Sequence, residues 1–578
     1  MRANEVPTPV NTASSRRPWR GLAPLLLWSL PLVFLAVFFF LPLGEIFRLA
    51  GEAALRDGLS EGVWGRIWRP LRFTIFQAGL STLLTLLLGI PAAYVFARFT
   101  FPGKSLLRVL TTLPFILPTV VVAASFNALL GPRGWANLLL MDVFGLQSPP
   151  IHLLNTLWAI LLAHVFYNTT IVIRVLGTAW EQLDPRLEAA ARVLGASPLR
   201  ALWEVTFPLL RPALLSALLL VFMFDFTSFG VVLLLGGPRY ATMEVEIYIQ
   251  ALSMLNLPVA GLLSAVQLLF TLLLTVLYSA AAGRRSVPLA PRVRGEGMRR
   301  PTRWRELLMV WLVVSALVVL LVSPLAALAV RSITRIDADR GERGQVDTGL
   351  TLQYYQELFI NRRGSLFYVP PIAAARNSLV YAGITVALSL LMGSLAAYSL
   401  ARPSRINRVL DPLLMLPLGA SAVTLGLGYI VTFDRPPLDV RSFPWLIPIA
   451  HSLVALPFVV RALQPALASI PLSLRQAAAV LGASPWRVWR EVDLPIVARA
   501  AMVGAIFSFT ISLGEFGATS FLARPEYPTL PVAIFRFLSQ PGALNYGQAL
   551  AMATLLMLVC ALSILVLERF RLTSGSDF

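Results

Sequence analysis

Two stretches of the sequence repeat one pattern: LEAAARVLGASPLRALWEVTFPLLRPAL at residues 187–214 and RQAAAVLGASPWRVWREVDLPIVARAAM at residues 475–502. In each copy an Ala-rich run ends at a glycine, Gly195 or Gly482, and a Ser-Pro pair follows. Glycine lets a helix stop and turn tightly, and Ser-Pro suits the first turn of a new helix. The pattern therefore predicts a helix–turn–helix projection that occurs twice in the chain.

The repeat extends well beyond these two stretches. The second copy lies 287 residues after the first, and the same offset aligns single residues elsewhere in the two halves. These pairs are His164 and His451, Arg174 and Arg461, Pro208 and Pro495, Phe229-Gly230 and Phe516-Gly517, and Thr242 and Thr529. Earlier in each half, AAYVFAR at 92–98 matches AAYSLAR at 396–402. A parallel repeat of this kind predicts two halves related by an axis near the membrane normal, with a central pathway between them.

The composition indicates a membrane protein. Apolar residues make up 57% of the 578 residues and charged residues only 13%, whereas a soluble domain carries about 25% charge. This balance excludes an ordinary cytosolic enzyme and a disordered protein, because lipid is the remaining solvent for so much apolar surface. The single cysteine, Cys560, excludes a disulfide framework within the chain. The net charge of +19 comes from arginines between apolar runs, which favours a membrane over nucleic acid as the partner.

Twelve apolar runs are long enough to cross a bilayer, which takes about 20 residues. They cover residues 22–44, 73–97, 107–130, 153–175, 209–233 and 258–282 in the first half, and 306–330, 376–401, 409–431, 442–463, 496–521 and 545–567 in the second. Arginines gather before the first run and after the second, sixth and eighth, which places both termini in the cytoplasm. The expected fold is an all-α polytopic membrane protein with about 12 transmembrane helices, arranged as two parallel six-helix repeats.

These runs divide the chain into five parts. We expect a cytoplasmic N-terminal tail at 1–21, a first six-span repeat at 22–282, an Arg-rich cytoplasmic linker at 283–305, a second six-span repeat at 306–567 and a cytoplasmic C-terminal tail at 568–578.

The repeated loop resembles the EAA coupling loop in permeases of ATP-binding-cassette (ABC) importers that use a substrate-binding protein. The resemblance covers nearly the whole chain, and it implies that each cytoplasmic loop docks into a cleft on an ATPase subunit. The matching positions are Glu188, Ala189, Ala190, Gly195 and Pro208 in the first copy and Gln476, Ala477, Ala478, Gly482 and Pro495 in the second. The family's acidic position holds Ala189 and Gln476 here, with Glu188 one residue early, so which acid contacts the ATPase stays open.

The resemblance also implies the partners of this chain. They are an ABC ATPase subunit, expected in two copies, an extracytoplasmic solute-binding protein and the lipid bilayer of a bacterial inner membrane, with no nucleic acid. ATP and Mg²⁺ are expected on the ATPase, because Gly103-Lys104-Ser105 lacks the first glycine of a phosphate-binding loop. We expect this chain to have no catalytic residue, metal or cofactor of its own. A twelve-span secondary transporter is the alternative from another class, and it would not need the glycine-turn loops.

Polar and aromatic residues within the spans are candidates for the translocation pathway. Carboxylates inside a membrane are costly and point to function, and here they are Asp225 and Glu515. The remaining candidates are His164, His451, Phe226, Phe229 and Phe516. A span that begins at the repeated proline would carry the Phe-Gly pairs near the outer face, with the segments around Thr242 and Thr529 facing the binding protein. The alternative role for the histidines and acids is pairing between spans.

Within the family, the chain is most similar to the fused two-half permeases for thiamine and for ferric iron. The stretches ILLAHVFYN at 160–168, FTSFGVVLLLGG at 226–237 and ATMEVEIYIQAL at 241–252 look most like thiamine permeases. Ferric permeases tend to have an acid before the Phe-Gly pair in both halves, whereas the first half has Ser228 there. The resemblance favours thiamine, whose cation the carboxylates and aromatic faces would attract, with ferric iron or another small solute as alternatives.

Overall fold

A computed structural model describes residues 19–56, 61–283, 298–335, 349–361, 370–401, 404–434, 439 and 443–572. Within these residues the regular structure is helical, and the connecting turns and loops contain two isolated β-bridges, which join Phe99 to Arg299 and Thr334 to Leu350. The predicted all-α fold is confirmed. Most of the expected N-terminal tail and Arg-rich linker, and the end of the C-terminal tail, lie outside the described residues.

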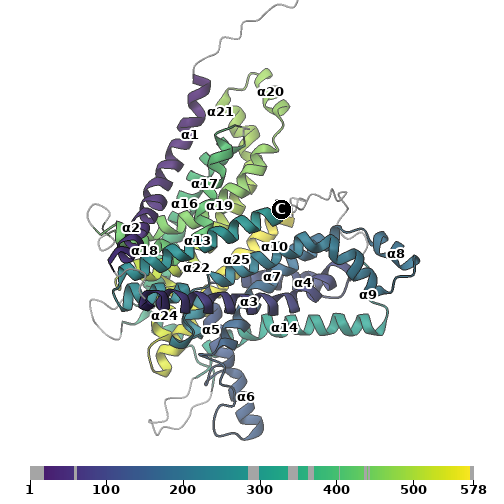
Figure 1. Ribbon diagram of the computed structural model, residues 1–578, viewed down its shortest axis with the longest axis vertical. Helices are drawn as coiled ribbons and strands as arrows, with labels where there is room; N and C mark the ends of the chain where they lie inside the picture. The colour runs from purple at the N-terminus through teal and green to yellow at the C-terminus, as the bar shows by residue number, and fades with distance from the viewer. Residues whose placement is uncertain are drawn as a thin grey trace, which may run out of the picture.

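The first half contains α1 to α13 (Figure 1). Its helices are α1 (Trp19–Leu35), η1 (Ala36–Phe40), α2 (Leu41–Arg56), α3 (Glu61–Arg98), α4 (Lys104–Ile116), α5 (Thr119–Leu130), α6 (Trp135–Phe144), α7 (Leu157–Gln182), α8 (Pro185–Val193), α9 (Pro198–Ala201), η2 (Leu202–Thr206), α10 (Phe207–Phe226), α11 (Gly230–Leu235), η3 (Pro238–Tyr240), α12 (Met243–Tyr248), η4 (Ile249–Ser253) and α13 (Leu257–Gly283).

The second half contains α14 to α25 and repeats this order from its second long helix onward. Its helices are α14 (Trp304–Ser332), α15 (Gln353–Gln356), η5 (Glu357–Phe359), α16 (Pro371–Leu400), α17 (Asn407–Gly419), α18 (Ala422–Thr432), α19 (Leu446–Ala468), α20 (Leu472–Val480), α21 (Pro485–Val488), η6 (Trp489–Asp493), α22 (Leu494–Gly514), α23 (Gly517–Leu522), α24 (Leu530–Leu538) and α25 (Ala543–Leu572).

The number of membrane crossings agrees with the sequence, but two crossings are bent. Ten described helices are long and apolar enough to span a membrane, and two further helix pairs bend by 112° after α4 and by 95° after α17. The total reaches twelve when each bent pair counts as one span. The expectation of continuous spans at 107–130 and 409–431 is therefore wrong. The first bend is explained by Pro118, since the residue before a proline, here Leu117, is driven out of the helical conformation.

Three helices form the centre of each half in the same arrangement. In the first half α3, α7 and α10 pack together, and in the second half α16, α19 and α22 do so. Val172, Trp180 and Leu210 are buried where the first three meet, and Val459 and Leu463 are buried in the second set. These triplets position both candidate histidines, which lie on α7 and α19.

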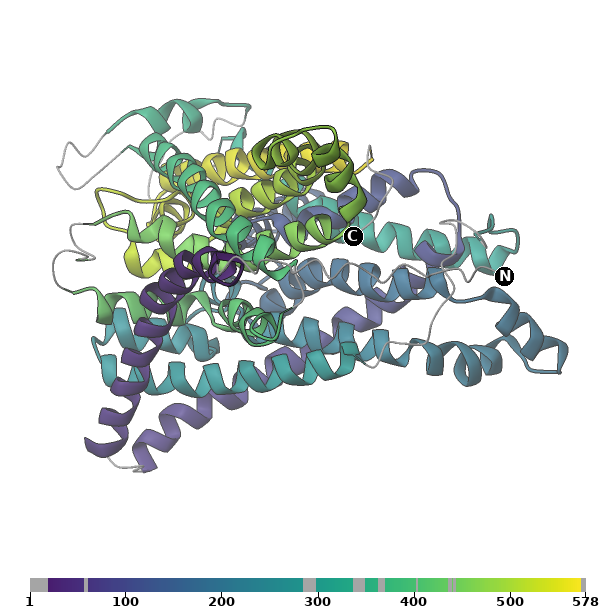
Figure 2. The same cartoon turned by 90° about the horizontal axis from the view of Figure 1, so that it is seen from above.

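The first long helix of each half packs against the other half. Helices α1 and α2 lie against α16 and α18, and α14 lies against α3, α4 and α5 (Figures 1 and 2). Leu35 and Phe39 accordingly belong to the core of the second half, whereas Val313 and Leu317 of α14 pack among first-half residues. The sequence repeat therefore does not coincide with two separately packed units.

Candidate functional site

Four crossings of the described chain are interrupted by short breaks. The breaks are Leu117-Pro118 between α4 and α5, Thr227–Phe229 between α10 and α11, Ala420-Ser421 between α17 and α18, and Glu515-Phe516 between α22 and α23. The second and fourth spans of this set were expected to be continuous over 209–233 and 496–521, and the structure corrects this. Residues from all four breaks line one cavity of about 400 Å³, which is within the usual size range of a small-molecule site.

The repeated Phe-Gly pairs mark the second and fourth breaks. A side-chain carbon placed on Gly230 would lie 2.4 Å from Thr119 Oγ1, and one placed on Gly517 would lie 2.9 Å from the Cβ atom of Ala422. Glycine is thus required for the close approach of α11 to α5 and of α23 to α18. The two equivalent contacts bring the start of each short helix against the break in a neighbouring span.

The phenylalanines of these pairs meet between the two halves. Phe229 and Phe516 stack with their ring centroids 5.4 Å apart and are buried. Both rings line the cavity. Helices α10 and α22 end at these breaks, and the chain then continues into short buried helices. The depth of the Phe-Gly pairs in the membrane stays a prediction.

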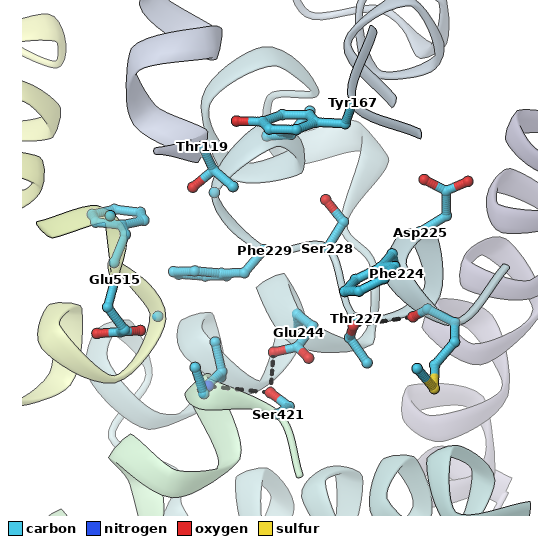
Figure 3. A pocket seen from close by; sticks show the side chains of 18 of the residues that line it. Thr119, Tyr167, Phe224, Asp225, Thr227, Ser228, Phe229, Glu244, Ser421 and Glu515 are labelled. Atoms are coloured by element: carbon cyan, nitrogen blue, oxygen red, sulfur yellow. Dashed lines mark hydrogen bonds between the residues drawn. The ribbon is translucent and has the colours of Figure 1, made fainter. Parts of the chain in front are cut away.

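The cavity is lined by acidic and aromatic side chains (Figure 3). Among the described residues that line it there are three carboxylates, Asp225, Glu244 and Glu515, and no lysine or arginine. Its aromatic side chains are Phe115, Tyr167, Phe224, Phe229 and Phe516. In the view of Figure 3, Asp225 and Glu515 lie on either side of Phe229. This combination is suited to a cation, because carboxylates attract positive charge and aromatic faces bind it.

In the first half the cavity wall contains a network around His164. His164 Nδ1 lies 2.7 Å from Nε2 of Gln77 and 3.3 Å from Oδ1 of Asp225, and His164 Nε2 lies 2.8 Å from Oγ of Ser228. Asn168 also donates a hydrogen bond of 2.7 Å to Asp225. The predicted pathway residues His164 and Asp225 are therefore brought together, and both line the cavity.

In the second half Glu515 is held at the start of α23. Its carboxylate accepts hydrogen bonds from the backbone N–H groups of Ala518 and Thr519, at 2.8 and 2.9 Å, and from the Thr519 hydroxyl at 2.5 Å. His451 Nε2 lies 3.2 Å from Glu515 Oε2, and its Nδ1 lies 2.8 Å from Oγ of Ser512. Glu515 thus lines the cavity and also caps a helix, where a negative charge is favourable.

Two predicted pathway residues do not line the cavity. Phe226 is fully buried on a different side of its helix, where it stacks on Phe270 with ring centroids 4.6 Å apart. His451 lies behind Glu515 and contacts the cavity only through it. Helical spacing explains the first case, because Phe226 points about 100° away from Asp225 around α10.

Thr242 and Thr529 are themselves buried, whereas Arg239 and residues 525–527 just before them are exposed, so the contact of these segments with a binding protein stays a prediction. Thr242 and Thr529 precede α12 and α24, and both side chains are almost fully enclosed. The first N–H of each helix is bound by an equivalent hydroxyl, with Met243 donating to Thr74 at 2.9 Å and Leu530 to Ser378 at 2.7 Å. These short helices are therefore part of the packed interior.

Sequence reasoning missed one carboxylate of the cavity, Glu244 on α12. It accepts hydrogen bonds from Ser421 Oγ, at 2.6 Å, and from the side-chain amide of Gln267. Ser421 lies at the break between α17 and α18, so this contact joins the two halves (Figure 3). Two features could have revealed the site: an acid within the apolar stretch 241–252, and a serine just before the run AVTLGLG.

The repeated loops form the predicted helix–turn–helix projections. Helices α8 and α20 end before Gly195 and Gly482, whose φ angles are +93° and +84°, and these positive values are what a glycine turn requires. The side chains of Ser197 and Ser484 then cap the short helices α9 and α21. Figure 1 shows the two projections at separate places on the molecule, α8–α9 at one end of the first half and α20–α21 on the second.

Each projection continues directly into the long helix that reaches the cavity. After α9 a π-helical turn, η2, joins α10, so residues Pro198–Phe226 form one helix of 29 residues, or about 43 Å. The equivalent helix in the second half covers Pro485–Gly514. Pro208 and Pro495 lie inside these continuous helices, two residues after the π-helical turns η2 and η6 end, and each lacks the N–H that would bond to the preceding turn. A displacement of either projection would thus be carried along a helix to a cavity break.

The tips of the projections expose apolar side chains to solvent. Val193, Leu194, Val480 and Leu481 are each at least 86% exposed, which is costly unless a partner covers them. Ala189, Ala190, Gln476 and Ala477 are exposed and Ala478 is half-buried. Glu188 pairs with Arg98 at 3.5 Å, which links α8 to the end of α3.

Comparison with known proteins gives a consistent assignment. Residues 85–286 and 389–571 both match the family described as binding-protein-dependent transport system inner membrane component. The chain is 27% identical over 92% of its length to the thiamine transport system permease protein ThiP of Brucella abortus (strain 2308), covering 94% of that protein. It is 28% identical over 96% of its length to a probable ABC transporter permease protein, y4fN, of Sinorhizobium fredii, covering 96% of it.

A half-length relative matches as well. Over 48% of this chain and 97% of the relative, the identity is 32% to a putative 2-aminoethylphosphonate transport system permease protein, PhnU, of Salmonella paratyphi A. The double family match agrees with the internal repeat and with the two copies of the helix–turn–helix projection. The chain therefore belongs to the family of binding-protein-dependent transport system inner membrane components, the multi-pass permease subunits of ABC transporters.

Proposed function

We propose that this chain forms the translocation pathway of an ATP-driven importer for an organic cation, with thiamine as the substrate. The observation that carries the proposal is the cavity at the four helix breaks, whose described ionisable lining consists of three carboxylates, one histidine and one tyrosine. Thiamine carries a permanent positive charge on a ring that has no N–H to donate. Such a cation is bound by carboxylate charge and aromatic faces, and this cavity offers both.

The two projections are the proposed docking sites for a separate ATPase, present in two copies on the cytoplasmic side. Their exposed apolar tips need a protein partner, and the continuous helices from Pro198 and Pro485 lead from them to the cavity. Closure of the ATPase on ATP would move these helices and change the opening of the cavity. The solute-binding protein would deliver substrate from the opposite side of the membrane.

The cavity supports thiamine better than the two other substrates that the family suggests. A phosphonate anion would require positive charge, and no lysine or arginine of the described chain lines the cavity. A ferric ion would require several oxygen ligands around one point, and no group of three or more His, Cys, Asp or Glu side chains that could hold a metal is found in the described residues.

Reconstitution tests this proposal. The purified chain alone is expected to show no ATP hydrolysis, whereas the complex with its ATPase in proteoliposomes should hydrolyse ATP faster when a thiamine-loaded binding protein is added outside. Radiolabelled thiamine should then accumulate inside, and excess 2-aminoethylphosphonate or ferric citrate should not compete. Robust ATP turnover by the chain alone would contradict the permease role, and competition by either other compound would contradict the choice of thiamine.

A further inference from the structure

Glu244 differs from the other two carboxylates of the cavity in what surrounds it. Asp225 lies beside His164, and Glu515 lies beside His451 and receives two backbone N–H groups at the start of α23. Each of these acids therefore has a titratable partner, and Glu515 also has a helix N-terminus to offset its charge.

The partners of Glu244 are both neutral. Its two oxygens accept from the amide of Gln267 and from the hydroxyl of Ser421, and among the described residues no basic side chain forms an ion pair with it. The side chain is 1% exposed and lines the cavity. A buried carboxylate without a counter-charge is unfavourable when it is ionised, and a positive charge that arrives in the cavity would stabilise that ionised form.

Ser421 connects this carboxylate to the other half of the molecule. Its hydroxyl gives its hydrogen to Glu244 Oε2, while the same oxygen accepts from the backbone N–H groups of Val423 and Thr424 at 3.1 and 3.3 Å. The hydrogen-bonded chain therefore runs from α12 of the first half, across the cavity wall, into the first turn of α18 of the second half. A cation that binds the Glu244 carboxylate would weaken the hydrogen bond between Glu244 and Ser421, and with it the link to the first turn of α18.

We infer that Glu244 is the carboxylate that makes the pathway specific for a cationic substrate. We also infer that Ser421 transmits the binding of the cation at Glu244 to the second half of the molecule. This inference rests on the proposed function, since it takes thiamine as the cation. It assigns the attraction of the cation first to Glu244, whereas Asp225 and Glu515 mainly hold the helices around the cavity.

Variants of Glu244 and Ser421 separate the effect of the carboxylate charge from the effect of the hydrogen bond between the two halves. Glu244→Gln keeps an oxygen acceptor but removes the charge, so the permease–ATPase complex should bind radiolabelled thiamine roughly tenfold or more weakly in equilibrium dialysis. Glu244→Asp keeps the charge and should restore most of the binding. Glu246→Gln is the matched control. Glu246 lies two residues further along the same helix, accepts a hydrogen bond from Gln250 and does not line the cavity.

Ser421→Ala keeps the carboxylate of Glu244 and removes its hydrogen bond to the second half. Its thiamine affinity should stay within about threefold of the parent protein, while the stimulation of ATP hydrolysis by thiamine-loaded binding protein should fall at least about threefold. If Glu244→Gln unfolds, as judged by thermal melting of the complex, Ser421→Ala still tests the inference, because thiamine affinity and the stimulation of ATP hydrolysis are measured separately in that variant.

The outcomes distinguish this inference from the proposed function. If the parent complex neither binds nor accumulates thiamine, the proposed substrate is wrong. If the parent complex transports thiamine but Glu244→Gln binds it normally, or loses no more affinity than Glu246→Gln, the role of Glu244 is refuted. Normal stimulation of ATP hydrolysis in Ser421→Ala would refute the transmission through Ser421.

Discussion

The two halves of the molecule place a histidine at equivalent positions but surround it in opposite ways. In the first half the acid Asp225 lies at Nδ1 of His164 and the hydroxyl of Ser228 lies at Nε2. In the second half the hydroxyl of Ser512 lies at Nδ1 of His451 and the acid Glu515 lies at Nε2. At the repeat offset Asp225 aligns with Ser512, and Ser228 with Glu515. The acid and the hydroxyl have thus exchanged places.

This exchange shows that the same arrangement of histidine, acid and hydroxyl can have a different structural role in each half. In both halves the histidine contacts one acid and one hydroxyl at the aligned positions, and His451 Nε2 also lies 2.8 Å from the hydroxyl of Thr519. In the first half the acid lies inside α10 and ties it to α7 through Asn168. In the second half the acid lies at the break itself and caps α23. Each half therefore keeps an acid beside its histidine, but only the second half uses that acid to stabilise a short helix.

The largest loss of uptake is expected from substitutions of the loop glycines, where the two halves are most alike. Gly195 and Gly482 have φ angles of +93° and +84°, and a side-chain carbon at either would meet no atom within 4 Å. Valine would therefore act through the backbone alone, at a cost of roughly 1–2 kcal/mol per turn, a factor of about 5–30. Uptake in proteoliposomes should fall by this factor in Gly195→Val or Gly482→Val, and should be lost in the double variant.

Asparagine at the same positions is the control, since it tolerates the left-handed conformation. Gly195→Asn and Gly482→Asn should retain most uptake. Normal uptake in the double valine variant would contradict the coupling role of both loops, and a defect in only one single variant would show that the two loops are not equivalent.

An intermediate effect is expected at the two acids. Glu515→Gln replaces the charged acceptor of the α23 N–H groups by a neutral amide oxygen, which should destabilise the protein by about 1 kcal/mol and lower uptake. In Asp225→Asn the amide oxygen can still accept from Asn168, so the fall in melting temperature should be smaller. The exposed Glu526→Gln, in the same half as Glu515, serves as the control. A lower melting temperature for Asp225→Asn than for Glu515→Gln would reverse the proposed division between the halves.

The smallest effects are expected at the ion pairs that anchor the loops. Arg475 contacts Asp493 at 2.8 Å, with the carboxylate largely buried, whereas Arg98 and Glu188 lie 3.5 Å apart. Partly exposed pairs contribute about 0–1 kcal/mol, so Arg475→Ala and Arg98→Ala should each lower the melting temperature by only a few degrees. Arg475→Ala should have the larger effect in thermal melting. The opposite order would indicate that the Glu188 pair matters more than its geometry implies.

Local features of the loops could be predicted because they depend on neighbouring residues. A glycine after an Ala-rich run and a Ser-Pro pair specify a helix stop and a helix start within one turn, and the structure has both at Gly195 and Gly482. The candidate pathway was predicted less completely. His164, Asp225, Phe229, Glu515 and Phe516 line the cavity, but Phe226 and His451 do not, and Glu244 was missed.

The reason for these differences is the helix breaks. Apolar runs at 209–233 and 496–521 are long enough to span a membrane, and length and hydropathy contain no sign that they stop at Phe226 and Gly514. The stop depends on close packing of Gly230 on Thr119 and of Gly517 on Ala422. These contacts join segments that are far apart in the chain.

By itself, the sequence determined the all-α membrane fold, the two parallel repeats and the paired helix–turn–helix loops, because composition, periodicity and turn chemistry act over short distances along the chain. Only the tertiary structure decided that α1 and α14 cross to the opposite half, that four breaks meet around one cavity, and that Glu244 reaches Ser421. Such arrangements depend on which apolar faces pack best against one another, and many pairings of similar helices satisfy the same hydrophobic pattern.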